Sequence, residues 1–251
     1  MAQDDESPSK SPFTPGFVAS AVMIGAIALV GVVVVALVLW PGSDDDAVDT
    51  AEPEPSAESS PPADREADGD ESMCGLPASD ETELTEPPAG TEWEVVGTMP
   101  APSLEEAGPG MTDDDGVRQC YAHSPEGALM AAANVLAMGT DPDLAYPMNE
   151  VMVSEGQGRD AALAELEQQG LGDTGGMRTE VAGFNILGYG PDHARVDLAM
   201  ESSTGMFASM TTDLLWEEGD WKERMNTEGQ PFIPVAQIPD ASGYIPWSAE
   251  G

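Results

Sequence analysis

The two cysteines are the residues of this chain whose chemistry is easiest to define. Cys74 and Cys120 form an even pair, which outside a reducing compartment predicts one disulfide. Such a bond would close a loop of about 47 residues and stabilise the fold by about 4 kcal/mol in the chain-entropy account. No histidine–cysteine spacing typical of zinc accompanies the pair. His123 lies near Cys120, but a catalytic cysteine–histidine pair would need a third orienting group. We therefore expect a structural disulfide and no metal site.

Sequence motifs for catalysis are absent. No pair of carboxylates with helical spacing lies on an apolar face, and no serine nucleophile elbow occurs. The glycines of residues 170–176 lack the lysine and hydroxyl ending of a phosphate-binding loop. Trp216 and Trp221 flank a predicted hairpin, where packing in the core or at its rim is favoured and lining of a ligand pocket is the alternative. We expect neither an enzyme nor a cofactor.

The charge of the chain is strongly one-sided. It contains 47 acidic and 8 basic side chains, for a formal net charge of −39. A charge of this sign repels phosphate backbones and anionic lipid surfaces, so nucleic acids are excluded as partners. Solubility of a secreted domain, in a high-salt habitat for example, is the favoured explanation of the acidity, and a cation-binding role is the alternative.

Residues 17–40, FVASAVMIGAIALVGVVVVALVLW, contain no charged or amide side chain. A helix of this length spans roughly 36 Å, enough for a hydrocarbon core of about 30 Å. Trp40 is placed as an interfacial anchor, and Pro41-Gly42 would end the helix. The run is too long for a cleaved signal peptide and has no small-residue cleavage site after it. We predict a single membrane span with a cytoplasmic tail of residues 1–16, because Lys10 precedes the span and aspartates follow it.

The rest of the chain divides by composition into three parts. Residues 41–73 are rich in Pro, Ala, Ser, Asp and Glu, which predicts a disordered acidic linker. Residues 74–230 have the patterns of a folded extracytoplasmic domain. Residues 231–251 form a proline-rich arm that is unsuited to a sheet interior. This arm would either dock on its own domain or wait for a partner, and docking is favoured.

The domain begins with a short strand near residues 93–96, followed by a loop from Ala101, and its core is expected to start near Val117. A helix follows, with Ser124 as N-cap, Pro125 at its first position and Gly139 as its terminator. Residues 141–155 predict two short helical turns interrupted by Pro147, and residues 159–169 predict a second helix.

After residue 177 the apolar pattern changes from helical to alternating. Strands are predicted at residues 181–189, 194–200, 206–216 and 221–225, joined by turns that include Gly190-Pro191-Asp192-His193 and Glu217-Glu218-Gly219-Asp220. One face of this antiparallel meander is apolar and must be covered, and the helices are the available cover. The fold class is therefore α+β, in two layers.

The order of these elements looks like the cone-shaped, nuclear-transport-factor-like fold. The resemblance is carried by VAGFNILGYGPDHARVDLAM leading to LLWEEGDWKERM, with the strand that ends at Trp216 and restarts at Trp221-Lys222. Membrane-anchored domains of this fold resemble scaffold proteins of type IV secretion and of Gram-positive conjugation. Through CGLP, CYAHSPEGALMAAAN and GYIPW the chain also resembles single-pass actinobacterial membrane proteins of an uncharacterised family found with mobile elements. Conjugation scaffolds are usually less acidic than this chain.

Enzymes of this fold class place a carboxylate, tyrosine or histidine inside the cone. The resemblance therefore nominates five residues: Asp143, Tyr146, Tyr189, His193 and Asp197. His193 falls in a predicted turn, and Asp197 falls on the strand face opposite Val196 and Leu198, so both are expected to be solvated. Tyr146 joins Trp216 and Trp221 as a residue that would line a pocket or a contact.

The resemblance and the composition together imply a single-pass protein of the cell membrane whose domain lies outside the cell. We expect a scaffold or accessory component of a conjugative transfer or secretion apparatus that acts through protein–protein contacts. Its partners would be other membrane or secretion proteins, or further copies of itself. The alternative is an extracytoplasmic module of the same fold that binds a small ligand or acts as a sensor.

Overall fold

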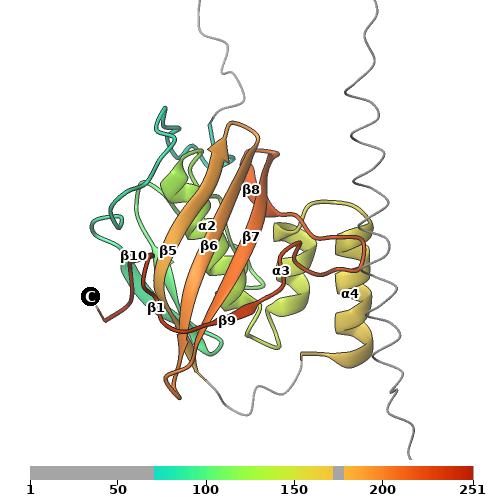
Figure 1. Ribbon diagram of the computed structural model, residues 1–251. Coiled ribbons are helices and arrows are strands. Elements are labelled where there is room, and N and C mark those ends of the chain that lie inside the picture. The colour runs from blue at the N-terminus through green and yellow to red at the C-terminus, as the bar shows by residue number, and fades with distance from the viewer. Residues whose placement is uncertain (1–70, 172–177, 251) are drawn as a thin grey trace, which may run out of the picture. The chain divides into compact units, whose positions relative to one another are not determined.

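The computed structural model describes residues 71–171 and 178–250, which form three helices and ten strands (Figure 1). The predicted tail 1–16, the span 17–40, residues 41–70 of the predicted linker and most of the glycine-rich loop lie outside the described residues. Among the residues that are described, no helix is both long and apolar enough to cross a membrane. The α+β prediction for the domain is confirmed, because three helices pack on a largely antiparallel sheet.

The main sheet has the strand order β10-β5-β6-β7-β8. Its long strands are β5 (Thr179–Gly190), β6 (His193–Ser202) and β7 (Phe207–Glu217), and they pair antiparallel as the alternating pattern predicts. The short strand β8 (Asp220–Glu223) returns along β7 after a tight turn. In that turn Glu218 and Gly219 have φ values of 56° and 78°, the left-handed pair that matches the twist of a two-residue hairpin.

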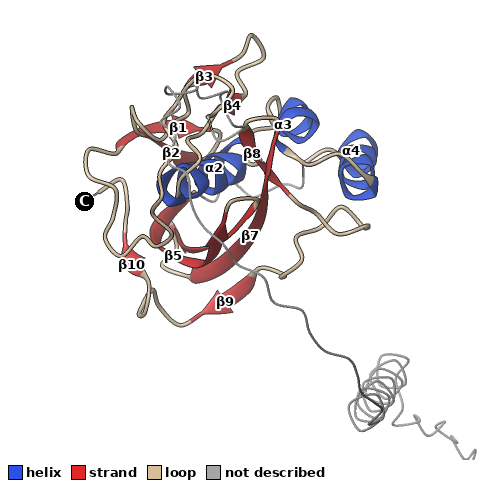
Figure 2. Cartoon of the chain, turned by 90° about the horizontal axis from the view of Figure 1, so that it is seen from above, coloured by secondary structure: helices blue, strands red, loops and turns tan. Residues whose placement is uncertain are grey.

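Helix α2 (Pro125–Met138) begins and ends where the sequence predicts. Ser124 Oγ accepts a hydrogen bond from Gly127 N at 3.0 Å, which satisfies one free N–H of the first turn. Gly127 is required there, because a Cβ at this position would lie 1.9 Å from the carbonyl oxygen of Ala122. The helix is buried on all sides and not on one stripe, since it lies between the concave face of the sheet and a separate hairpin (Figure 2).

That hairpin consists of β1 (Glu92–Val96) and β2 (Met99–Ser103). The predicted strand near residues 93–96 is confirmed, but the prediction of a loop from Ala101 is wrong. The expected start of the core near Val117 is also wrong, because Met99 and Ala101 are buried against α2. The prolines of β2 make its sequence typical of a loop. The strand tolerates them because only one of its edges pairs with another strand, β1.

The other helices are α3 (Ala145–Met152) and α4 (Gln157–Gln169). The predicted pair of broken turns is wrong, since Pro147 lies in the first turn of one continuous helix, where a missing N–H costs little. Helix α4 confirms the second predicted helix, and it ends at Gly170 with a φ of 64°. Strands β3 (Met111–Thr112) and β4 (Arg118–Gln119) form a separate antiparallel pair of two residues each.

The carboxy-terminal arm is docked along most of its length on its own domain, as the favoured of the two predictions expects. Strand β9 (Ala236–Ile238) pairs with the start of β7, and β10 (Ile245–Pro246) pairs with β5 at the opposite edge of the sheet. Residues 239–244 cross the outer face between these two strands, and we call them the strap (Figure 1). Trp247 ends the docked part, with its ring 4.7 Å from that of Trp93.

The predicted disulfide between Cys74 and Cys120 is present. Next to it, the carboxylate of Asp220 accepts hydrogen bonds from Cys120 N at 2.7 Å and from Tyr121 N at 2.8 Å. A third bond comes from Trp221 N at 2.9 Å. Asp220 is 2% exposed, and both of its carboxylate oxygens accept hydrogen bonds. This buried carboxylate therefore joins the β7–β8 turn to the segment that contains Cys120.

We predict that Asp220→Asn destabilises the protein by about 2–4 kcal/mol, because an amide NH₂ would replace an acceptor and leave a buried N–H unpaired. The measurement is chemical unfolding followed by circular dichroism, with Asp143→Asn at an exposed aspartate as the control. Equal midpoints for the two variants would contradict the role of the carboxylate.

Candidate functional site

The two predicted tryptophans meet at the β7–β8 hairpin. Their ring centroids are 5.1 Å apart, and Trp221 is fully buried in the core. The ring of His123 stacks on Trp216 with centroids 4.1 Å apart, and His123 Nε2 lies 2.6 Å from the carbonyl oxygen of Pro191. Tyr146 does not belong to this aromatic cluster. Its hydroxyl donates a hydrogen bond to Glu167 Oε1 on α4 at 3.1 Å. The structure thus brings two of the three predicted residues together, in a packed arrangement.

The residues nominated for the interior of a cone are dispersed. Asp143 is exposed ahead of α3, and His193 is exposed at the start of β6, as its turn predicts. Tyr189 packs toward Trp221 with ring centroids 5.7 Å apart. Asp197 lies on the predicted outer face, but the expectation that it is solvated is wrong, because it is only 9% exposed.

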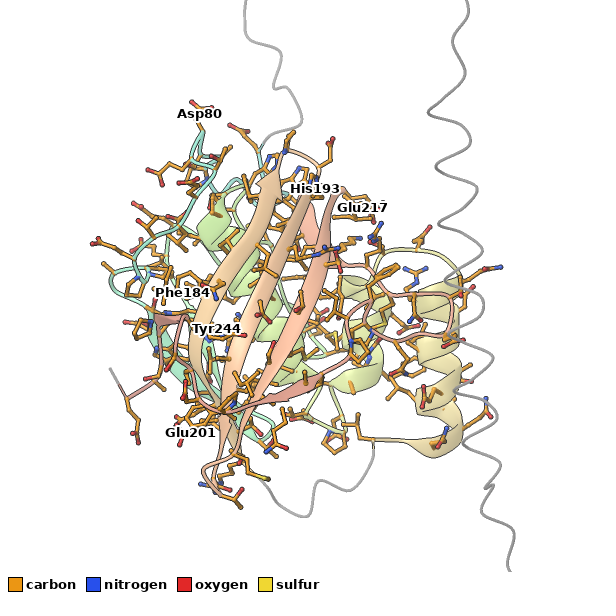
Figure 3. The ribbon with its side chains drawn as sticks, viewed as in Figure 1. Asp80, Phe184, His193, Glu201, Glu217 and Tyr244 are labelled. Carbon is orange, nitrogen blue, oxygen red and sulfur yellow. A yellow bond between two sulfur atoms is a disulfide. The ribbon has the colours of Figure 1, made fainter. Side chains whose placement is uncertain are left out.

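The strap is what buries Asp197. The hydroxyl of Tyr244 donates to Asp197 Oδ2 at 2.6 Å, while Ser209 and Thr211 donate to Oδ1 at 2.7 and 3.0 Å. Burial and then the bond to Asp197 raise the pKa of Tyr244, which keeps it a donor. Figure 3 shows Tyr244 over the middle of the sheet. This half of the outer face is therefore closed by a satisfied polar network.

We predict that Tyr244→Phe costs about 1–3 kcal/mol of unfolding free energy, because it leaves a buried carboxylate oxygen without a donor. Tyr146→Phe is the matched control, since it removes a similar bond between a hydroxyl and a carboxylate at a partly exposed site. Thermal unfolding and proteolysis of the carboxy-terminal residues measure the effect, and a similar loss in both variants would argue against a closing role for the strap.

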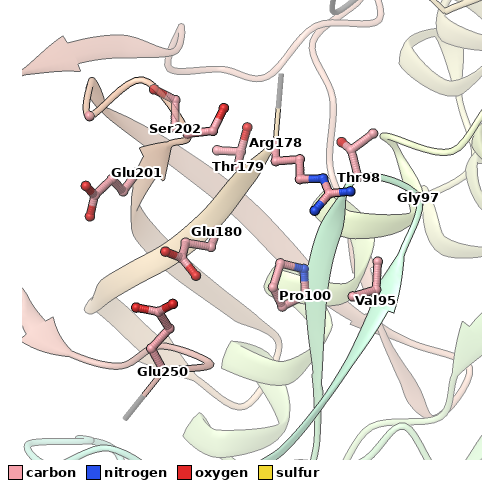
Figure 4. A pocket seen from close by; sticks show the side chains of 12 residues that line it. Val95, Gly97, Thr98, Pro100, Arg178, Thr179, Glu180, Glu201, Ser202 and Glu250 are labelled. Carbon is pink, nitrogen blue, oxygen red and sulfur yellow. The ribbon is translucent and has the colours of Figure 1, made fainter. Parts of the chain in front are cut away.

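A large hollow lies between the β1–β2 hairpin, the start of β5 and the end of β6 (Figure 4). Its volume is about 780 Å³, and the side chains of Glu180, Glu201 and Glu250 line it together with Arg178. Burial, followed by the charges of Glu250 and Glu201, raises the pKa of Glu180. The hollow thus has the electrostatics to attract a cation. No group of three or more candidate ligands that could hold a metal ion occurs within residues 71–171 and 178–250.

A second hollow, of about 260 Å³, lies on the half of the outer sheet face that the strap leaves uncovered. We call this surface the open half and define it by residues contributed by β5, β6 and β7 and by the residue after β8. These residues are Leu187, Gly188, His193, Arg195, Asp213, Leu215 and Arg224. Unlike the strap-covered half, it combines exposed apolar atoms with two guanidinium groups.

The charges of the open half centre on Asp213. Arg195 donates to Asp213 Oδ1 from Nε at 2.9 Å and from Nη2 at 2.6 Å, and Arg224 Nη2 lies 4.0 Å from the same oxygen. The guanidinium of Arg224 stacks over the ring of Phe232, 4.4 Å from its centroid. The open half therefore continues directly into the residues that precede β9.

A further carboxylate is buried beside β7. Burial, and after it the charge of Asp213, raises the pKa of Glu223 to about 7, and burial raises the pKa of Asp220 to about 6 against the pull of its three backbone N–H donors. Sequence reasoning missed both carboxylates, because in the charged strand β8 nothing but the nearby Trp221 indicates burial. It also missed Arg195 and Arg224 as parts of the outer face, and it did not single out Tyr244 within the arm that it expected to dock.

We predict that the protein becomes less stable as the pH rises from about 4.5 to 7. The folded chain keeps a proton on Glu223 up to about pH 7, whereas the unfolded chain releases it near its ordinary value of 4.5. The expected loss from this group is on the order of 2–3 kcal/mol. Glu223→Gln should flatten the dependence of the melting temperature on pH, whereas Glu228→Gln, at an exposed site, should not. Parallel curves for the two variants would contradict the assignment.

Comparison with known proteins gives a family and nothing closer. A family described as a domain of unknown function, DUF8175, matches residues 51–246. No curated protein and no solved structure matches the chain.

Proposed function

The chain belongs to the DUF8175 family, and we propose that its domain is an extracytoplasmic, protein-binding scaffold or accessory component held at a membrane by residues 17–40. The family description names no activity, so the proposal depends on the surface geometry and on the sequence. We further propose that the helices and the curved sheet are a nuclear-transport-factor-like cone. That fold, with the single span, favours a role in a conjugative transfer or secretion apparatus.

The proposal depends on one observation: the arm is docked from β9 onward, and it exposes large apolar side chains before β9. Phe232, Ile233 and Val235 are 45, 39 and 55% exposed. They stand between Pro231 and strand β9, and Pro234 restricts the backbone within the run. Apolar side chains held in a stiff, ordered segment at the surface are typical of a protein contact, because little conformational entropy is lost on binding.

The surroundings of this segment extend the exposed apolar surface. Phe232 lies over Arg224 of the open half, and Leu187 of the same surface is 54% exposed. The remainder of the domain is strongly acidic, which opposes non-specific association with membranes and with other acidic proteins. Binding would then be confined to the part of the surface where apolar groups and cations occur together.

A ligand-binding module is the second candidate function, and the large hollow favours it. Its volume of about 780 Å³ lies in the usual range of small-molecule sites, about 300–1,000 Å³. Three glutamates on its wall indicate a cationic ligand. Val95, which lines that hollow and is 73% exposed, distinguishes the two functions experimentally.

The test is crosslinking of the full-length protein in its native membrane, with the captured proteins identified by mass spectrometry. We expect membrane or secretion-apparatus proteins, and we expect the combined change Phe232→Ser, Ile233→Ser and Val235→Ser to lower their yield by about tenfold or more. Val95→Ser is the matched control, because it removes an exposed apolar side chain elsewhere and should leave the yield unchanged.

Two results would contradict the scaffold. One is that the wild-type protein captures no other protein, and the other is that the yield falls with Val95→Ser and not with the triple variant. The second result, together with a thermal shift on addition of a cationic ligand such as a polyamine, would favour the binding module.

A further inference from the structure

The few cations of the domain are not spread evenly over its surface. The described residues contain six basic side chains: Arg118, Arg159, Arg178, Arg195, Lys222 and Arg224. Three of them lie on the two sides of β7, with Arg195 on β6, Lys222 on β8 and Arg224 just after β8. In a chain with a net charge of −39, this makes the open half a local exception in charge.

The two arginines of the open half keep hydrogen-bonding capacity. Arg195 directs two of its five N–H donors to Asp213 and is 43% exposed. Arg224 is 45% exposed and makes no side-chain hydrogen bond within residues 71–171 and 178–250, since its nearest approach to Asp213 is 4.0 Å. One carboxylate thus lies between two guanidinium groups, which leaves a net positive charge and a free donor set.

The apolar part of the site has room for side chains. Gly188 faces Arg195 across the β5–β6 pair, beside an irregularity in the register, and a Cβ built on it would meet nothing within 4 Å. Leu187 and Leu215 line the space above it. Its volume of about 260 Å³ is below the range of about 300–1,000 Å³ that small-molecule sites need, which favours anchoring of one or two side chains.

We propose that the open half binds an extended segment of a partner protein in which a carboxylate side chain stands next to an aliphatic or aromatic one. The partner's carboxylate accepts hydrogen bonds from the donors of Arg195 and Arg224 that Asp213 does not use, and the apolar side chain packs on Leu187 and Leu215. This assignment rests on the proposed function and names the chemistry of the partner. Arginine suits the role, because its planar fork matches a carboxylate in two parallel hydrogen bonds.

A protein segment fits this surface better than an anionic membrane does. Asp192, Glu217 and Glu218 lie at the nearby hairpin turns, so a flat anionic surface would meet carboxylates at the rim before it reached the arginines. A narrow extended segment avoids that rim. A basic segment is excluded for the opposite reason, because both guanidinium groups would repel it.

The experiment places a photo-crosslinking residue at Leu187 of the full-length protein in its native membrane and sequences the attached peptide. We expect a peptide of another protein with Asp or Glu within a few residues of the attachment point. Arg224→Glu should reduce the yield by about tenfold or more, and so should an increase in salt. Arg178→Glu makes the same charge change at the other hollow and should have little effect.

The proposal is overturned if the yield survives Arg224→Glu, or if the attached group is a basic peptide, a lipid or the acidic segment 41–70 of this chain. Failure here is distinguishable from failure of the scaffold. If Leu187 captures nothing while the triple variant of residues 232–235 still loses its partners, the scaffold stands and the open half is not its binding site.

Discussion

The fold depends on one buried ion, the carboxylate of Asp220. It joins the β7–β8 turn to the segment of Cys120, and through the disulfide to the start of the domain at Cys74. Burial opposes its charge more strongly than its three backbone N–H donors favour it, so the pKa of the carboxyl is raised to about 6. A pKa of about 6 still leaves the carboxyl mostly ionised at pH 7, where it accepts hydrogen bonds from three backbone N–H groups. The ion is therefore retained at neutral pH, and the otherwise irregular segment 118–123 has a fixed position against the sheet.

Much of the fold could be predicted from local patterns. Ser124, Pro125 and Gly139 mark the ends of α2, and the alternation after residue 177 marks the long strands, because these signals act within a few residues. Strand β2 could not be predicted from β-propensity, since proline is depleted in strands and β2 contains Pro100 and Pro102. It exists because β1 supplies the hydrogen bonds and α2 supplies the apolar contact, and both partners are defined only by the tertiary structure.

The candidate site was less predictable for a related reason. Alternation places Asp197 on the outer face correctly, but it does not say what covers that face. The cover is Tyr244, which lies 47 residues away and is part of an arm whose prolines indicate no regular structure. The proximity of Arg195 and Arg224 could not be predicted either, because only the strand register brings both of them close to the carboxylate of Asp213.

The outer face shows two ways of keeping a carboxylate on a sheet of a very acidic protein. Asp197 accepts hydrogen bonds from hydroxyl groups of the strap and of β7, so that half needs no cation and is closed. Asp213 is paired with arginines, which leaves charge and exposed donors behind. The acidic surface of this domain repels other acidic proteins. A local group of arginines is therefore a place where an acidic partner can be attracted. The half that uses arginines is therefore the half on which a specific contact can form, and the strap sets its boundary.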